Sequence, residues 1–328
     1  MLDSPHLSPT PPPPLNPVTK WVLAARAPFL TAVIVPIVIA TAVARYDTGM
    51  LNWPLFFLTL LGGILAHAGA NLSNDYFDDK TGNDRVNRYR SPFSGGTGLI
   101  QAGVIPARQV YAAALSCYVA AAAIGLYLAY LRGWPVLVLM AAGGLIGFFY
   151  TAGPAALAYR GLGEYFLGLA FGPLLVAGAY YVQTQTFSAR MWVASVPIGL
   201  LVTAILYINQ YPDYEADRAV GKNNAVVRMG RRQALGGYYG LLVATYVWLT
   251  LAAVLPGAAG PTGSSRSPWA TLLGLLTVPL AAKAMGVAAR HHDDPRAILP
   301  ANGMTILIHL ATGLLQSAGF FIAAIMGV

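Results

Sequence analysis

The chain has 328 residues, of which 56% are hydrophobic and only 10% are charged, and its formal net charge is +8. Soluble globular domains carry about 25% charged residues, so this composition excludes an ordinary soluble domain and indicates an integral membrane protein. The positive charge does not indicate nucleic-acid binding, because its distribution between the apolar segments is the one that orients a membrane protein.

The amino-terminal segment, MLDSPHLSPTPPPPLNPVTK, is rich in proline. It lacks the charged start and apolar core of a secretory signal peptide. Residues 1–20 are therefore predicted to form a disordered, polyproline-like tail. Residues 21–328 are predicted to form a single transmembrane domain.

Apolar runs long enough to cross a bilayer, which takes about 20 residues, recur along the rest of the chain. They lie at about 21–45, 54–75, 107–131, 134–150, 164–184, 191–212, 235–257, 268–290 and 302–327. Only helices and closed barrels satisfy their backbone hydrogen bonds within lipid, and no segment alternates polar and apolar residues with period two. We therefore expect an all-α integral membrane fold with nine transmembrane helices.

The basic residues predict the orientation of these helices. If the amino terminus is cytoplasmic, four of the 20 lysines and arginines fall on the opposite side, namely Arg45, Arg132, Arg190 and Arg266. Cytoplasmic loops of membrane proteins carry an excess of Lys and Arg. The sequence thus predicts a multi-pass protein of the cytoplasmic membrane, with its amino terminus and the loops after spans two and six in the cytoplasm.

Two acidic stretches follow spans two and six, and they share one pattern. Both NLSNDYFDDKTGND (71–84) and NQYPDYEADRAVGK (209–222) read N-x-x-x-D-x-x-x-D, with Asn71, Asp75 and Asp79 in the first and Asn209, Asp213 and Asp217 in the second. On a helix, positions i, i+4 and i+8 lie within an arc of about 80°. Each stretch is therefore predicted to direct an amide and two carboxylates along one face. Asp78 lies close to that face, and Glu215 points elsewhere.

A pair of such motifs favours a cation site over solvated surface acids. Carboxylates one turn apart repel each other, and a low-dielectric border increases the cost. Magnesium takes oxygen ligands and is typically held by one or two carboxylates together with substrate phosphates. The sequence thus predicts that bridging Mg²⁺ ions hold a diphosphate, the leaving group of activated isoprenoids, with the ligands Asp75, Asp78, Asp79, Asp213 and Asp217.

Basic and aromatic residues near the two stretches are candidate contacts of the diphosphate. Arg26 lies in the first apolar run, where a charge is either functional or snorkels to the surface. The other candidates are Lys222, Arg90, Arg160, Arg228 and Tyr150, each of which is also compatible with an orienting loop charge or, for Tyr150, with an interfacial tyrosine. His67 extends the first stretch by one turn and either orients an acceptor ring or bonds a neighbouring helix.

The chain resembles the UbiA superfamily of intramembrane prenyltransferases, and within it the branch that includes 1,4-dihydroxy-2-naphthoate prenyltransferases. The resemblance covers residues 21–328. It rests on the two acidic stretches, on SPFSGGTGLIQAGVI (91–105) and on YTAGPAALAYRGLGE (150–164). It implies nine helices in a ring around a central cavity, capped on the cytoplasmic side by the loops after helices two and six. Lys222 matches the family's GK position, and Tyr150 resembles a family tyrosine near the phosphates.

The resemblance implies Mg²⁺-dependent transfer of a polyprenyl group from polyprenyl diphosphate to an aromatic acceptor, with two ions bridging to the diphosphate. For the naphthoate branch it implies menaquinone biosynthesis, with attack at the carbon that bears the carboxylate and loss of carbon dioxide. Another acceptor, such as 4-hydroxybenzoate, homogentisate or a lipid alcohol, and cyclisation of a terpene diphosphate stay open. A cation-coupled transporter is disfavoured, because transporter sites lie near the bilayer midplane and these acids follow the ends of two spans.

Overall fold

The computed structural model describes residues 16–257, 259–260 and 263–327, and this part of the chain is almost entirely helical. In chain order the elements are α1 (Pro17–Ala24), η1 (Ala27–Leu30), α2 (Thr31–Thr48), α3 (Trp53–Thr81), α4 (Asn83–Val86), α5 (Ala107–Arg132), α6 (Pro135–Phe149), η2 (Leu157–Arg160), α7 (Gly163–Leu169), η3 (Ala170–Leu174), α8 (Leu175–Thr184), α9 (Ala189–Ala219), α10 (Ala225–Met229), α11 (Arg231–Val254), β1 (Ala259–Gly260), β2 (Gly263–Ser264), η4 (Trp269–Thr277), α12 (Val278–His291) and α13 (Leu299–Met326). The strands are a short antiparallel pair, so the predicted all-α membrane fold is confirmed.

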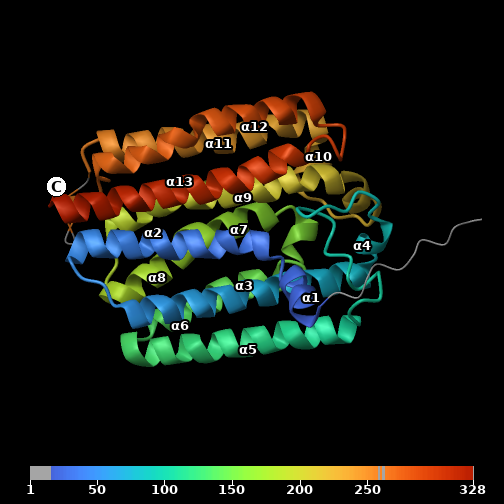
Figure 1. Ribbon diagram of the computed structural model, residues 1–328, viewed down its shortest axis with the longest axis horizontal. Helices are drawn as coiled ribbons and strands as arrows, with labels where there is room; N and C mark the ends of the chain where they lie inside the picture. Colours follow the sequence, from blue (N-terminus) through green and yellow to red (C-terminus); the bar gives the residue numbers. More distant parts are fainter. Residues whose placement is uncertain (1–15, 258, 261–262, 328) are drawn as a thin grey trace, which may run out of the picture.

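The long helices run side by side along the longest axis of the molecule (Figure 1). In the described residues, eight segments are long and apolar enough to cross a membrane: Ala27–Thr48, Trp53–Thr81, Ala107–Arg132, Gly163–Thr184, Ala189–Ala219, Arg231–Val254, Trp269–His291 and Leu299–Met326. Helix α6 is also apolar but has 15 residues, fewer than the about 20 that a perpendicular crossing takes. The count of nine spans therefore stays a prediction.

The first apolar run is broken near its start, which the sequence did not predict. Helix α1 ends at Ala24, and Arg26 adopts a left-handed conformation with φ 53° and ψ 56° before α2 begins. Because α1 already starts at Pro17, the predicted end of the tail at residue 20 is wrong. Residues 1–15 of that tail lie outside the described residues.

Glycines bring α7 and η3 into close contact with α9. A Cβ atom on Gly199 of α9 would lie 2.7 Å from the carbonyl oxygen of Gly168, and one on Gly172 would lie 2.6 Å from the Cα of Gly199. Small residues at such a crossing let two backbones approach within van der Waals distance. The crossing fixes the helix that begins at Gly163 against the helix that carries the second acidic stretch.

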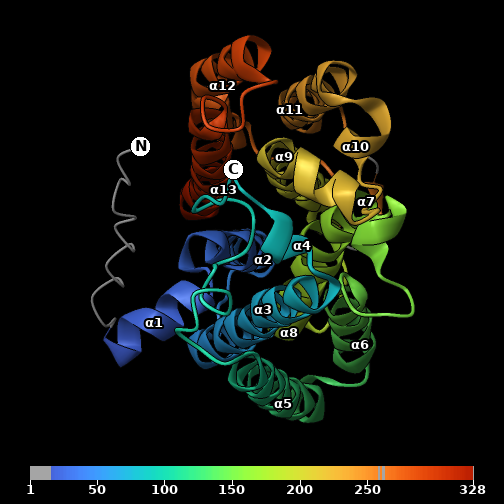
Figure 2. The same ribbon diagram turned by 90° about the vertical axis from the view of Figure 1, so that its right-hand side faces the viewer.

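Both acidic stretches lie at the same end of the bundle, where α4 and α10 also lie, while the carboxyl terminus marks the opposite end (Figure 1). Gly82, with φ 85°, ends α3, and Val220 follows the last residue of α9. The segment after α3 contacts α9, and the segment after α9 contacts α3. Figure 2, which looks onto this end, shows α4 between the ends of α3 and α9.

Candidate active site

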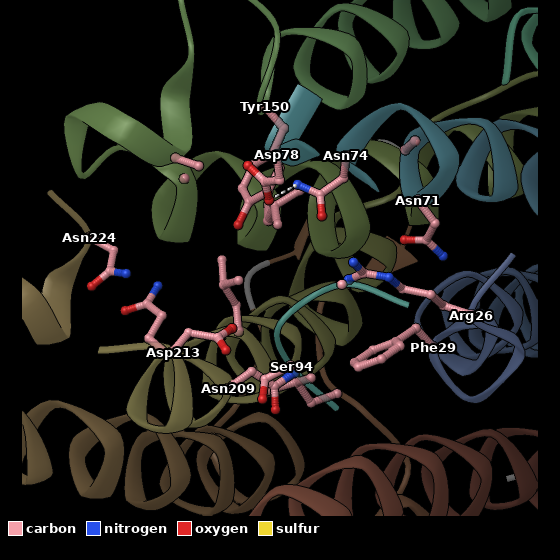
Figure 3. Close-up of a pocket in the computed structure, with 18 of the residues that line it drawn as sticks. Arg26, Phe29, Asn71, Asn74, Asp78, Ser94, Tyr150, Asn209, Asp213 and Asn224 are labelled. Carbon is pink, nitrogen blue, oxygen red and sulfur yellow. Dashed lines mark hydrogen bonds between the residues drawn. The ribbon is translucent and has the colours of Figure 1, made fainter. Parts of the chain in front are cut away.

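A cavity of about 190 Å³ lies under these two segments. Figure 3 shows side chains from α3, α9 and the loops pointing into it from several sides. Its polar lining includes Arg26, Asn71, Asn74, Asp78, Asn83, Asp84, Asn87, Tyr150, Glu164, Asn209, Gln210, Asp213, Asp217, Lys222 and Asn224. The cavity thus collects carboxylates and amides from both acidic stretches around a lysine.

Helix α3 presents Asn71, Asn74 and Asp78 to this cavity. Their spacing of three and four residues places them along one helix face. Asp78 is 4% exposed, accepts a hydrogen bond of 3.1 Å from Asn74 Nδ2 and another of 3.1 Å from the hydroxyl of Tyr159. Asp78 is therefore a fixed, buried carboxylate at the cavity wall.

The helical phase predicted for the first stretch is wrong for two of its aspartates. Asp75 forms an ion pair with Arg26 and accepts from Thr97 Oγ1 at 2.5 Å. Asp79 accepts from Arg85 Nε at 3.1 Å. Neither aspartate lines the cavity, because residues of the segment after α3 cover their side of the helix. Asp75 and Asp79 therefore brace that segment.

In the second stretch Asn209, Asp213 and Asp217, predicted to share one helix face, all line the cavity. Glu215 points elsewhere, as predicted, because its side chain is 59% exposed and pairs with Arg231 at 3.1 Å. The two stretches differ because the segment after α3 covers the side of α3 that carries Asp75 and Asp79, whereas the corresponding face of α9 borders the cavity.

The loop after α3 bonds both aspartates of the second stretch. Asp213 accepts from Asn87 Nδ2 at 2.8 Å and from the backbone N–H of Gly95 at 3.1 Å. Asp217 accepts from Asn83 Nδ2 at 2.9 Å. Neutral amide donors stabilise these two carboxylates and leave further lone pairs of their oxygens available to a cation.

Lys222 joins the two acidic stretches electrostatically. Its Nζ lies 3.5 Å from Asp78 and 3.5 Å from Asp217, and 5.6 Å from the ring centroid of Tyr159. Burial by itself would lower the pKa of Lys222, but Asp217 and Asp78 outweigh it and hold that pKa well above its ordinary value. Lys222 is therefore a permanent cation between carboxylates that would otherwise repel each other.

Asp84 is a site residue that the sequence did not single out. It follows the helix-ending Gly82, is 3% exposed, and its Oδ2 has no hydrogen-bond partner among the described residues. Burial, reinforced by Asp78 and Asp75, raises the pKa of Asp84 to about 8. The surroundings of Asp84 therefore disfavour an uncompensated negative charge on its carboxyl.

Three arginines predicted to contact a diphosphate do not line the cavity. Arg90 donates to the backbone carbonyls of Asp84 and Gly95, so it braces the loop after α3. Arg160 and Arg228 also donate to backbone carbonyls, at 2.9 and 3.4 Å. By contrast, Arg26 and Tyr150 line the cavity, and their contact with a diphosphate stays a prediction.

A second and larger cavity, of about 650 Å³, continues from the first. It is lined mainly by apolar residues of α3, α5, α6 and α8, and the two cavities share His67, Ala70, Gly147, Leu167 and Phe171. His67 packs against Phe171 with ring centroids 5.0 Å apart, and its Nδ1 has no hydrogen-bond partner among the described residues. His67 thus marks the junction of a polar and an apolar chamber.

The donors of the polar cavity fit Mg²⁺ that is bound together with a phosphate. In the described part of the chain, no three His, Cys, Asp or Glu side chains lie close enough to enclose a metal by themselves. Magnesium commonly takes one or two carboxylates and completes its shell with water and substrate phosphates. Asp78, Asp84, Asp213 and Asp217 supply such carboxylates, and the unpartnered Oδ2 of Asp84 suits this role.

Residues 33–322 match the profile of the UbiA prenyltransferase family. The chain belongs to this family. It is 31% identical to the 2-carboxy-1,4-naphthoquinone phytyltransferase of Synechocystis and 28% identical to the 1,4-dihydroxy-2-naphthoate octaprenyltransferase of Bacillus subtilis, in each case over 92% of both chains. This UbiA-family protein is therefore a prenyltransferase enzyme.

Solved UbiA structures share the fold. A UbiA homolog from Archaeoglobus fulgidus bound to GPP and Mg²⁺ aligns with a TM-score of 0.58 at 15% identity, over 91% of this chain and 99% of the other. An apo UbiA homolog from Aeropyrum pernix aligns with a TM-score of 0.61 at 17% identity, over 89% and 97%. This UbiA prenyltransferase therefore shares its fold with those solved homologs.

Proposed function

We propose that this UbiA prenyltransferase transfers a polyprenyl group from a polyprenyl diphosphate to 1,4-dihydroxy-2-naphthoate in menaquinone biosynthesis. The observation that carries the proposal is the junction of a polar chamber, which holds five carboxylates and Lys222, with a larger apolar chamber. This arrangement suits a substrate with a charged head and an apolar tail. The acceptor is inferred from the naphthoate-type names of the two relatives.

Two Mg²⁺ ions are assigned to Asp78, Asp84, Asp213 and Asp217. When bound, they would stabilise negative charge on the diphosphate as the allylic C–O bond breaks. Asp75 and Asp79, although predicted as ligands, are left out because neither lines the cavity and each forms an ion pair, Asp75 with Arg26 and Asp79 with Arg85.

The chain's own residues would bind the diphosphate and protect the reacting carbon. Lys222 would donate to the diphosphate oxygens, where a positive charge stabilises the developing anion, and the hydroxyl of Tyr150 would reach the same chamber. Leu167 and Phe171, at the junction, would keep water from the allylic cation. The acceptor carbon bearing the carboxylate would then form the new C–C bond and release carbon dioxide.

The amino terminus and the loops over the polar chamber are assigned to the cytoplasmic side of the membrane. This rests on the distribution of lysines and arginines. Both water-soluble components of the reaction, the diphosphate product and Mg²⁺, would then exchange with the cytoplasm.

The proposed reaction is tested with the purified protein in lipid, geranylgeranyl diphosphate, Mg²⁺ and 1,4-dihydroxy-2-naphthoate, with 4-hydroxybenzoate in parallel. We expect prenylated naphthoquinone from the naphthoate, and no product in excess EDTA. Product from 4-hydroxybenzoate alone would refute the acceptor. Diphosphate release that does not depend on any acceptor would instead indicate cyclisation or hydrolysis.

Filling the apolar chamber is expected to shorten the prenyl chain that the enzyme accepts. Gly143 of α6 lines this chamber, and a Cβ atom there would meet nothing within 4 Å. The Gly143→Leu variant should lower the ratio of kcat/KM for geranylgeranyl over geranyl diphosphate about tenfold, as expected for lost apolar volume. Gly240→Leu is the matched control, because Gly240 of α11 also has open space but lies outside both cavities. An unchanged ratio in Gly143→Leu would indicate that the prenyl chain binds outside the apolar chamber.

A further inference from the structure

Glu164 is a buried acid of the polar chamber to which the proposed chemistry gives no task. It lies in the first turn of α7, is 4% exposed and lines the cavity. Its Oε2 has no hydrogen-bond partner among the described residues. A buried carboxylate is costly unless donors compensate it, so the interactions of its other oxygen indicate why it is there.

The Oε1 atom of Glu164 connects three helices. It accepts from Gln210 Nε2 of α9 at 2.8 Å and from the backbone N–H of Ala225, the first residue of α10, at 2.7 Å. Gln210 Oε1 in turn accepts from the backbone N–H of Val226 at 3.3 Å. Glu164 and Gln210 together therefore fix the start of α10 against α7 and α9.

The segment fixed in this way carries two residues that contact Asp217. Asn224 accepts from the N–H of Val227 at 2.9 Å and donates to Asp217 Oδ2 at 2.6 Å. Lys222 donates its backbone N–H to the carbonyl of Asp217 at 2.8 Å, and its Nζ lies between Asp217 and Asp78. Residues 222–225 are thus held by Asp217 on one side and by Glu164 on the other.

We propose that Glu164 is a positioning residue, whose Oε1 sets the place of residues 222–225 and thereby aims Lys222 and Asn224 at the diphosphate site. The inference rests on the proposed function, because it assumes that Lys222 and Asp217 act on a diphosphate. Loss of Oε1 leaves two buried donors unpaired, which is costly, so the segment shifts. Glu164 does not need its negative charge for this role, since the oxygen of a glutamine accepts the same two hydrogen bonds.

The test compares Glu164→Ala with Glu164→Gln. We expect Glu164→Ala to lower kcat about 10²-fold, the cost of misplacing a reacting group by about 1 Å, with a smaller change in the KM of the acceptor. Glu164→Gln should retain nearly full activity. Glu215→Ala is the matched control, because Glu215 is the other glutamate of the chain and its side chain is exposed on α9. Equal loss in the Gln and Ala variants would overturn the proposal and assign the carboxylate charge itself to the reaction.

A mutant cycle of three substitutions separates positioning from general destabilisation. In an Asn224→Ala, Lys222→Met background, Glu164→Ala should have almost no further effect on turnover, because its targets are already gone. An additive loss would overturn the proposal.

A measurement without substrate keeps this inference separate from the proposed function. Hydrogen exchange of the peptide covering residues 222–230 should accelerate in Glu164→Ala and not in Glu164→Gln. If Glu164→Ala does not fold, Gln210→Leu, which removes the hydrogen bonds to both Glu164 and Val226, should accelerate exchange of the same peptide. Unchanged exchange would refute the positioning role even if the wild-type protein proves inactive towards every acceptor.

Discussion

Asp78→Asn is expected to lower prenyl transfer about 10²–10³-fold, the range typical of losing one group that stabilises transition-state charge. The neighbouring substitution, Asp79→Asn, is expected to leave the rate close to that of the wild type. Asp78 lines the polar chamber 3.5 Å from Lys222 Nζ, whereas Asp79 bonds Arg85 away from it. An asparagine at position 79 still accepts the hydrogen bond from Arg85. Only the substitution of Asp78 should therefore lower the rate.

The two variants should be compared as initial rates at several Mg²⁺ concentrations, in the same lipid and at equal amounts of folded protein. If Asp78 holds Mg²⁺, part of the activity lost in Asp78→Asn should be recovered at high Mg²⁺ concentration. If Asp79→Asn were the damaged variant and Asp78→Asn active, the face of α3 assigned to the metal would be wrong.

Lys222→Met is expected to lower kcat by a similar factor of about 10²–10³. Two carboxylates lie within 3.5 Å of its Nζ and keep its pKa well above the ordinary lysine value. The ammonium is therefore charged across the working pH range, and its loss should lower the rate equally at pH 6, 7 and 8. Lys222→Arg should recover little, because the planar guanidinium is not equivalent to a compact ammonium.

Single-turnover rates measured at those three pH values test this. Lys80→Met serves as the control, since Lys80 is an exposed lysine at the end of α3. A Lys222→Met enzyme with normal kcat and only a raised KM for the diphosphate would assign Lys222 to binding in the ground state rather than to bond breaking.

The sequence by itself determined the class of fold and half of the site. A chain this apolar must satisfy its backbone within lipid, and helices are the solution that its unbroken apolar runs allow. Asn209, Asp213 and Asp217 of the second acidic stretch, predicted to share one helix face, all line the cavity, and Lys222 was singled out because it matches the GK position of the family that the chain resembles. The apolar pattern also predicted α3, α5, α9 and α13 to within several residues, but not the break that precedes α2.

Only the tertiary structure decided which aspartates of the first stretch face the cavity. Helical periodicity fixes the angles between Asp75, Asp78 and Asp79 but not which side of α3 its neighbours cover. That side depends on the loop after α3, which returns to bond Asp75 through Thr97.

Asp84 and Glu164 are two further residues whose place in the site could not be predicted from the sequence. Asp84 enters the chamber after the helix has ended at Gly82, where no period predicts a direction, and Glu164 acts through Ala225, which is distant in sequence. Periodicity along one helix is local and can be read from the chain. The position of a residue in this site depends instead on contacts between segments far apart in the sequence, and those exist only once the helices have packed.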